Sequence, residues 1–304
     1  MNLIDFSSWN VYDGASEGSG RSEKIWLKSE DGTIGLFKFP KINPSNNKET
    51  TEHVSEHLAH KIGNAVGIPT ARVDIGTYNG RIGCMSYIVC EDKEILKEGI
   101  WFISAVFPKY DAEQMINTED GKYYCLEHIL RTVPRFSTGA MWMRMILFDF
   151  IIGNSDRHQS NWAILIKIGE NHSLTLRWCP LYDNGSSLCC FITDEDSSEY
   201  LGKDKIRFDS LVDSKSKSLI RIDGTQKKLP THREMVKHLL KNYSASKEIA
   251  KQIISKLSAE KIDELLIEYT DDILSETKKS LSKKFLIRKC EILNELLKEV
   301  ENDE

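Results

Sequence analysis

The sequence predicts an α+β protein with two lobes, a small β-rich lobe followed by a larger, mostly helical one. Short runs that alternate polar and apolar residues, separated by turn signals, occupy residues 24–39 and 71–89. This is the pattern of half-buried strands. From about residue 91 onward, helical periodicity dominates. We therefore assign residues 1–90 to the first lobe and residues 91–304 to the second.

The first lobe begins with a glycine-rich stretch, residues 13–23, which holds three glycines and three serines and indicates a flexible loop. Asp31-Gly32 and Asn79-Gly80 are typical hairpin turns between strands. Gly67 and Pro69 end a helix whose apolar residues fall on one stripe. The predicted elements are strands at 24–28, 33–39, 71–76 and 82–89 and a helix at 51–66.

The second lobe follows a charged run, residues 91–98, which we interpret as a connector. Helices are predicted at 120–133, 140–152, 230–242, 246–256 and 258–300, with a short β-rich island at 161–192. The longest apolar run is interrupted by Arg144 and Asp149 and is too short to span a bilayer. The N-terminus lacks the pattern of a signal peptide. We expect a cytoplasmic protein without membrane contact.

Charge and cysteine content narrow the function further. The formal net charge is −5, which disfavours a general nucleic-acid coat, so no direct DNA binding is expected. The seven cysteines are an odd number and none has CxxC spacing. Free thiols in a reducing compartment are the better interpretation than disulfides or a cysteine zinc site.

The most informative segment is Ile151 to Leu165, with the letters IIGNSDRHQSNWAIL. Asp156 and Asn161 lie five residues apart in it. In protein kinases the loop HRDxxxxN holds an aspartate that accepts the substrate hydroxyl proton, and an asparagine five residues later binds Mg²⁺. The surrounding letters differ here. The spacing nevertheless predicts Asp156 as the catalytic base and Asn161 as a metal ligand.

A second acidic segment, PLYDNGSSL, places Asp183 between a strand-like run and a glycine turn. In kinases this is the position of a second Mg²⁺-binding aspartate. Carboxylate and amide oxygens are the ligands that a hard cation requires. Asp183 and Asn161 are therefore the predicted Mg²⁺ ligands.

Lys38 lies inside the strand-like run LFKFP. A lysine between apolar neighbours is costly unless a partner neutralises it. In kinases the partners are ATP phosphates and a helix glutamate. Glu52 and Glu56 are both candidates, because they lie four residues apart on one face of the predicted helix.

The glycine-rich loop supplies the weakest of the candidate cofactor contacts. Gly18, Ser19 and Gly20 could let backbone N–H groups approach ATP phosphates. The loop matches neither GxGxxG nor a Walker A motif. His158 is a candidate acid–base or cofactor-binding group, but a hydrogen bond that holds the loop is the better interpretation.

Taken together, LFKFPK, EHVSEHLAHKIGNAVGIP, LFDFIIGNSDRHQSNWAIL and PLYDNGSSL resemble the HipA-like kinases, a family of bacterial serine/threonine kinases with a protein-kinase-like fold. The similarity covers roughly residues 14–201. It implies ATP and Mg²⁺ as cofactors, a protein substrate and a place among toxin–antitoxin systems. Family members suggest a translation factor or an aminoacyl-tRNA synthetase as substrate.

The resemblance also implies roles for residues outside the motifs. The strand end at residues 87–90, with Val89, would contact adenine. In this family the glycine-rich loop can carry an autophosphorylated serine, and Ser16, Ser19 and Ser22 are the matching positions. Compared with full-length HipA toxins, the chain is expected to be a short form without an extra N-terminal subdomain. This difference puts an antitoxin partner chain in doubt but not the chemistry.

Other functions stay open at this point. The Asp-Asn-Asp pattern is shared with phosphoinositide kinases, and a nucleotide-binding regulator without turnover would show the same residues. His53 to His57 matches HxxEH, a zinc-protease pattern that lacks a third ligand here. The basic stretch at 278–289 mostly indicates a solvated helix face, with an acidic or tRNA-bound substrate as the alternative.

Overall fold

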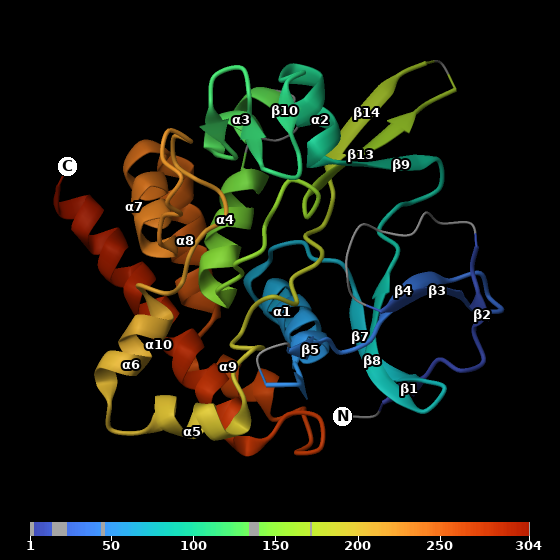
Figure 1. Cartoon of the computed structure of the whole chain (residues 1–304), viewed down its shortest axis with the longest axis vertical. Coiled ribbons are helices and arrows are strands. Elements are labelled where there is room, and N and C mark those ends of the chain that lie inside the picture. Colours follow the sequence, from blue (N-terminus) through green and yellow to red (C-terminus); the bar gives the residue numbers. More distant parts are fainter. Residues whose placement is uncertain (1–2, 14–22, 44–45, 134–139, 171, 304) are drawn as a thin grey trace.

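A six-stranded sheet forms most of the first lobe of the computed structural model, on the right of Figure 1. Its order is β1-β7-β8-β4-β3-β2, and all neighbours are antiparallel except the parallel pair β1 and β7. The structure describes residues 3–13, 23–43, 46–133, 140–170 and 172–303. The strands are β1 (Ile4–Asp5), β2 (Asn10–Val11), β3 (Lys24–Lys28), β4 (Ile34–Lys38), β7 (Val73–Tyr78) and β8 (Arg81–Tyr87).

Side-chain alternation along β4 explains where Lys38 points. Phe37 is fully buried in a small cluster with Phe6, Leu27 and Met85. Successive side chains of a strand point to opposite faces. Lys38 therefore lies on the other face of the sheet. Helix α1 (Glu52–Val66) packs against β7 and β8, so it brings its acidic residues within reach of this lysine.

The second lobe is built around α4, which lies at its centre, and α10, the long helix at the lower left of Figure 1. Every residue of α4 except Arg144 is buried, as expected for a helix that is apolar all round. Helix α10 packs against α4, α7, α8 and α9. The helices are α2 (Gly99–Val106), α3 (Leu126–Thr132), α4 (Met141–Ile152), α5 (Asp194–Leu201), α6 (Lys205–Val212), α7 (His232–Asn242), α8 (Ser244–Lys256), α9 (Ala259–Leu266) and α10 (Glu276–Asn302).

Three small sheets complete the fold. Strand β13 lies between β9 and β14 and is antiparallel to both, and it begins directly after the segment that carries Asp156 and Asn161. The other two sheets are β10-β11-β12 and β5-β6. The bounds are β5 (Ile42–Asn43), β6 (Lys48–Glu49), β9 (Glu94–Glu98), β10 (Tyr110–Asp111), β11 (Ile116–Asn117), β12 (Lys122–Tyr123), β13 (Ala163–Ile168) and β14 (Leu174–Trp178).

Several predicted elements differ from the structure. Part of the expected connector at 91–98 is strand β9, which pairs with β13 about seventy residues later, and such pairing leaves no local signal. The expected helix at 120–133 covers only Leu126–Thr132, because Gly121 turns the chain at φ +71° and a strand follows. The expected helix at 258–300 is two helices, because Ser275 caps a new one after the turn at 267–275.

Two other expectations concern the whole chain. The seven cysteines all lie in the described part, and none forms a disulfide, as predicted. Within the described ranges, no helix combines the length and the apolar character that crossing a bilayer requires.

A close contact between Gly99 and Trp162 generates the first prediction. A Cβ atom added to Gly99 would clash with Cε2 of Trp162, which is fully buried directly before β13. We expect Gly99→Ala to lower the free energy of unfolding by about 1–3 kcal/mol, because overpacking forces the ring or the backbone to shift. Ser104→Ala, an exposed change on the same helix, serves as the control. Chemical denaturation measures both, and equal midpoints would contradict the predicted clash.

Candidate active site

Lys38 lines a cleft between the two lobes. Its Nζ lies 2.8 Å from Oδ1 of Asp183 and 3.8 Å from Oε2 of Glu56. Burial disfavours the ammonium, but the two carboxylates outweigh burial and raise the pKa of Lys38 above its ordinary value. The charge of Lys38 in turn lowers the pKa of Asp183 to about 2. Lys38 and Asp183 are 145 residues apart in sequence, so this ion pair joins the lobes.

Glu56 rather than Glu52 is the helix residue that faces Lys38. Glu56 is fully buried, and its Oε1 accepts a hydrogen bond of 2.9 Å from the backbone N–H of Asn184. Burial raises the pKa of Glu56, and Lys38 opposes this shift. Glu52 accepts instead from Nζ of Lys41 at 2.8 Å. The structure thus separates two glutamates that the sequence could not distinguish.

Asp156 lies in a tight loop after α4 and lines the same cleft as Lys38 and Asp183. Its backbone N–H donates to Oδ1 of Asn154 at 3.1 Å. Its carbonyl accepts from Nδ2 of Asn161 at 2.8 Å and from the N–H of His158 at 2.9 Å. Burial raises the pKa of the Asp156 carboxyl, and the nearby side chains of His158 and Lys41 oppose the shift. The backbone of Asp156 is therefore held tightly while its carboxylate faces the cleft.

The oxygen atoms of Asn161 and Asp183 suit a magnesium ion. The hydrogen bond from Nδ2 of Asn161 fixes the amide orientation and leaves its Oδ1 as an available acceptor. Asp183 uses Oδ1 for Lys38, and its side chain is 45% exposed. Mg²⁺ is usually bound by one or two protein oxygens together with waters and phosphates. This donor set therefore fits the metal.

Arg157 joins the two segments that carry these residues. It is fully buried, and its Nε and Nη2 donate to the carboxylate of Asp149 on α4 at 2.7–3.2 Å. Its Nη1 donates to the carbonyls of Asn161 and Tyr182 at 2.7 and 2.8 Å. Its Nη2 also donates to Oδ1 of Asn184 at 2.6 Å. One side chain thus connects α4, the loop at 153–162 and the segment at 180–188.

The sequence interpretation missed Arg157 as part of the site, although a signal was present. Asp149 is the one acidic residue in an apolar helix, and a buried carboxylate requires a partner. Lys41 was missed as well. It lines the cleft between Glu52 and the carboxylates of Asp156 and Asp183. No local pattern distinguishes it from an exposed loop lysine.

The remaining candidates are Val89, His158 and the residues of the glycine-rich loop. Val89 packs against Ala163, Leu165 and Cys179 and does not line the cleft around Lys38. Nδ1 of His158 accepts from the N–H of Ser160 at 3.2 Å, which supports the loop-holding alternative for this residue. The glycine-rich loop candidates Gly18, Ser19 and Gly20 and the serines Ser16 and Ser22 lie outside the described residues.

The HxxEH pattern is used differently from a zinc site. Glu56 contacts Lys38 and Asn184, as described above. Nδ1 of His57 lies 2.7 Å from the hydroxyl of Tyr269, and burial lowers the pKa of His57 to about 4. Two of the three motif residues thus have other partners.

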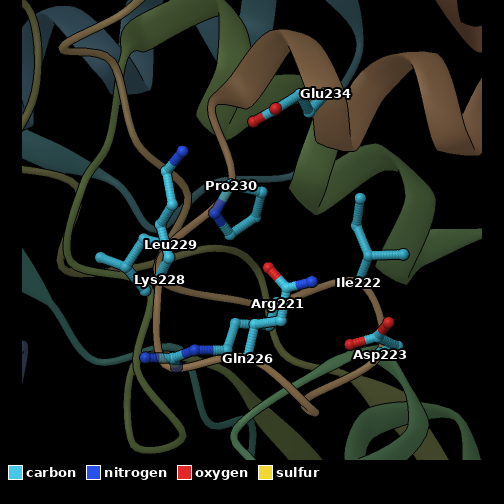
Figure 2. A pocket seen from close by; sticks show the side chains of 8 residues that line it. All are labelled: Arg221, Ile222, Asp223, Gln226, Lys228, Leu229, Pro230 and Glu234. Atoms are coloured by element: carbon cyan, nitrogen blue, oxygen red, sulfur yellow. The ribbon is translucent and has the colours of Figure 1, made fainter.

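A second hollow, of about 250 Å³, lies on the second lobe between residues 221 and 234 (Figure 2). Arg221, Asp223 and Glu234, three of its charged side chains, are bound within their own segment. Arg221 donates to the carbonyl of Lys227 at 2.7 and 3.2 Å, and Glu234 accepts from Thr231 in a capping box. None of the predicted site residues lines this hollow.

The two lobes and the lysine–carboxylate cleft define a kinase-like protein. The chain belongs to the family of HipA-like C-terminal domains, whose pattern matches residues 16–261. It is 27% identical over 203 residues to the serine/threonine-protein kinase CtkA of Helicobacter pylori. The match covers 62% of this chain and 57% of that protein, so the chain aligns with a little over half of its relative.

Solved structures confirm the two-lobed fold. The crystal structure of the proinflammatory kinase CtkA of Helicobacter pylori matches with a TM-score of 0.80 at 18% identity, over 98% of this chain and 100% of that one. HipA of Shewanella oneidensis, from a complex with HipB and operator DNA, matches with a TM-score of 0.58 at 13% identity. That match covers 96% of this chain and 68% of HipA.

The Arg157 network generates a prediction on stability. Arg157→Met removes the partner of a buried carboxylate, so we expect the free energy of unfolding to fall by about 3–5 kcal/mol. Lys48→Met is the control, because it breaks only the exposed ion pair with Glu195, and exposed ion pairs contribute little to stability. Denaturant titration measures both variants. Equal losses would show that Arg157 does not hold the site together.

Proposed function

We propose that this chain is a HipA-like serine/threonine protein kinase that transfers the γ-phosphate of ATP to a hydroxyl group of a protein. The observation that carries the proposal is the contact of Lys38 with both Asp183 and Glu56, in the cleft that Asp156 lines. In kinases, a lysine lies between the site that binds the ATP phosphates and a glutamate on a helix. Residues 1–90 and 91–304 would be the two lobes that enclose ATP.

Each residue has a distinct role in this proposal. Lys38 neutralises phosphate charge, and Glu56 keeps its ammonium in place. Asp156 orients the substrate hydroxyl and accepts its proton, a role that the raised pKa of its carboxyl favours. Positioning and charge stabilisation supply most of the rate enhancement in phosphoryl transfer.

Asn161 and Asp183 would hold Mg²⁺. The ion neutralises phosphate charge when it is bound. The low pKa of Asp183, about 2, keeps its carboxylate ionised at any physiological pH. Arg157 keeps both ligand segments at a fixed separation through its bonds to the carbonyls of Asn161 and Tyr182.

Two further proposals concern a partner and regulation. Because the HipA relative was solved with HipB and operator DNA, an antitoxin-like protein partner is one proposal for this chain. Autophosphorylation at Ser16, Ser19 or Ser22 is another. Mass mapping of phosphate after incubation with ATP and Mg²⁺ tests the second directly.

Asp156→Asn tests the proposed function. We expect phosphate transfer from ATP, to the chain itself or to an added serine-rich protein, to fall by about 10²–10⁴-fold, because the proton acceptor is lost. ATP affinity, measured by calorimetry, should stay within about twofold, since Asp156 contributes no phosphate-binding cation. Full transfer by the variant would refute the role of Asp156. ATP binding without transfer by the wild type would indicate a nucleotide-binding regulator instead.

The two helix glutamates provide a matched pair of variants. Glu56→Gln should lower kcat/KM for ATP by about 10²-fold, because Lys38 loses the partner that positions it. Glu52→Gln changes the same chemical group one helical turn away and should cost much less, since Glu52 contacts Lys41. Steady-state kinetics over a range of ATP concentrations measures both. A larger loss for Glu52→Gln would reverse the assignment.

A further inference from the structure

A chain of hydrogen bonds runs from the middle of α10 to the loop that carries Asp156. Nζ of Lys289 donates to Oγ of Ser216 at 2.8 Å. Oγ of Ser216 lies 2.9 Å from Nδ1 of His232, the first residue of α7. Nε2 of His232 lies 3.0 Å from the carbonyl oxygen of Asn154. Oδ1 of Asn154 then accepts the backbone N–H of Asp156 at 3.1 Å.

The direction of every bond in this chain is determined by chemistry. A carbonyl oxygen can only accept, so Nε2 of His232 carries the proton. Burial lowers the pKa of His232 well below its ordinary value, so the ring is neutral and its Nδ1 accepts. The hydroxyl of Ser216 must donate to Nδ1, and its oxygen is then free to accept from Lys289. The three bonds from Lys289 to Asn154 therefore donate toward the catalytic loop, and the N–H of Asp156 donates back to Asn154.

Lys289 occupies an unusual position for an ammonium group. It is fully buried, and among the described residues no carboxylate lies within 4.0 Å of its Nζ. Its other close contacts are the rings of Phe150, at 4.5 Å, and Phe285, at 5.3 Å. A buried cation without a paired carboxylate reduces stability, whereas an apolar residue of the same length would fill the space. The stability of the fold therefore does not explain Lys289.

We propose that Lys289, Ser216 and His232 are positioning residues, which hold the Asn154–Asp156 turn in the conformation that aims the Asp156 carboxylate into the cleft. The proposal deepens the proposed kinase function and rests on it for its effect on turnover. None of the three residues lines the cleft. They act on the reaction only through the backbone of the catalytic loop.

The test compares three variants, Lys289→Met, Ser216→Ala and His232→Phe, with the wild type. We expect kcat to fall by about 10-fold or more while KM for ATP stays within about twofold, because the ATP contacts lie elsewhere. The double variant Lys289→Met with Ser216→Ala should be no worse than Ser216→Ala alone, since both break one chain. Lys284→Met is the control. Lys284 also lies on α10 over a phenyl ring, that of Phe208 at 4.0 Å, but it donates to the carbonyl of Tyr200.

Hydrogen–deuterium exchange of residues 153–158 provides a measurement that does not depend on activity. We expect faster exchange of this segment in the three variants and wild-type exchange in Lys284→Met. If the wild type shows no phosphate transfer, the kinase function fails while the exchange result still decides the positioning role. Unchanged exchange in all three variants would overturn the proposal whatever their turnover.

The pH dependence of stability tests whether Lys289 is buried, as its place in the chain of hydrogen bonds requires. Burial lowers the pKa of Lys289 to about 7, against an ordinary value of 10.5. Asp213 and Cys189 oppose this shift, and Arg233 adds to it. Between these pH values the unfolded chain binds a proton that the folded chain does not, so the wild type gains stability as the pH rises. The amount by which Lys289→Met is more stable than the wild type should therefore decrease from pH 7 to pH 10. A constant difference would place Lys289 in solvent and overturn its role.

Discussion

The ion pair between Arg157 and Asp149 is the interaction on which the site depends. Two charges taken out of water are tolerated only when their geometry is good and their remaining donors are satisfied. Here the guanidinium meets the Asp149 carboxylate, two carbonyls and the Asn184 amide. A lysine could not replace it, because a single ammonium lacks the planar fork that reaches several acceptors at once. The pair therefore determines the separation of the segments that carry Asn161 and Asp183.

Two aspartates in one cleft have opposite pKa shifts because their surroundings differ. Lys38 lies against Asp183 and lowers its pKa, which keeps the Asp183 carboxylate ionised. Asp156 has no cation at hydrogen-bond distance among the described residues, and burial raises its pKa. A higher pKa makes a carboxylate a better proton acceptor. The cleft thus prepares two chemically identical groups for different tasks.

The sequence predicted the parts of the fold that rest on local patterns. The strand that carries Lys38 and the helix that carries Glu56 were expected within two residues of their observed bounds. The choice between Glu52 and Glu56 could not be made, because it depends on how α1 is rotated against the sheet. Strand β9 was missed because its partner strand is distant in sequence. Arg157 was missed although the buried carboxylate of Asp149 on α4 indicated a nearby cation.

The two lobes meet where the backbone at residues 184–185 of the second lobe approaches helix α1 of the first lobe. The N–H of Asn184 donates to Glu56, and a Cβ atom on Gly185 would lie only 3.0 Å from Oε2 of Glu56. A side chain at this position would require either Glu56 or the 180–188 segment to shift by a few tenths of an ångström. Because Asp183 precedes this contact directly, its distance to Lys38 would change with it. The glycine that follows Asp183-Asn184 thus lets the segment that carries Asp183 lie close to α1 of the other lobe.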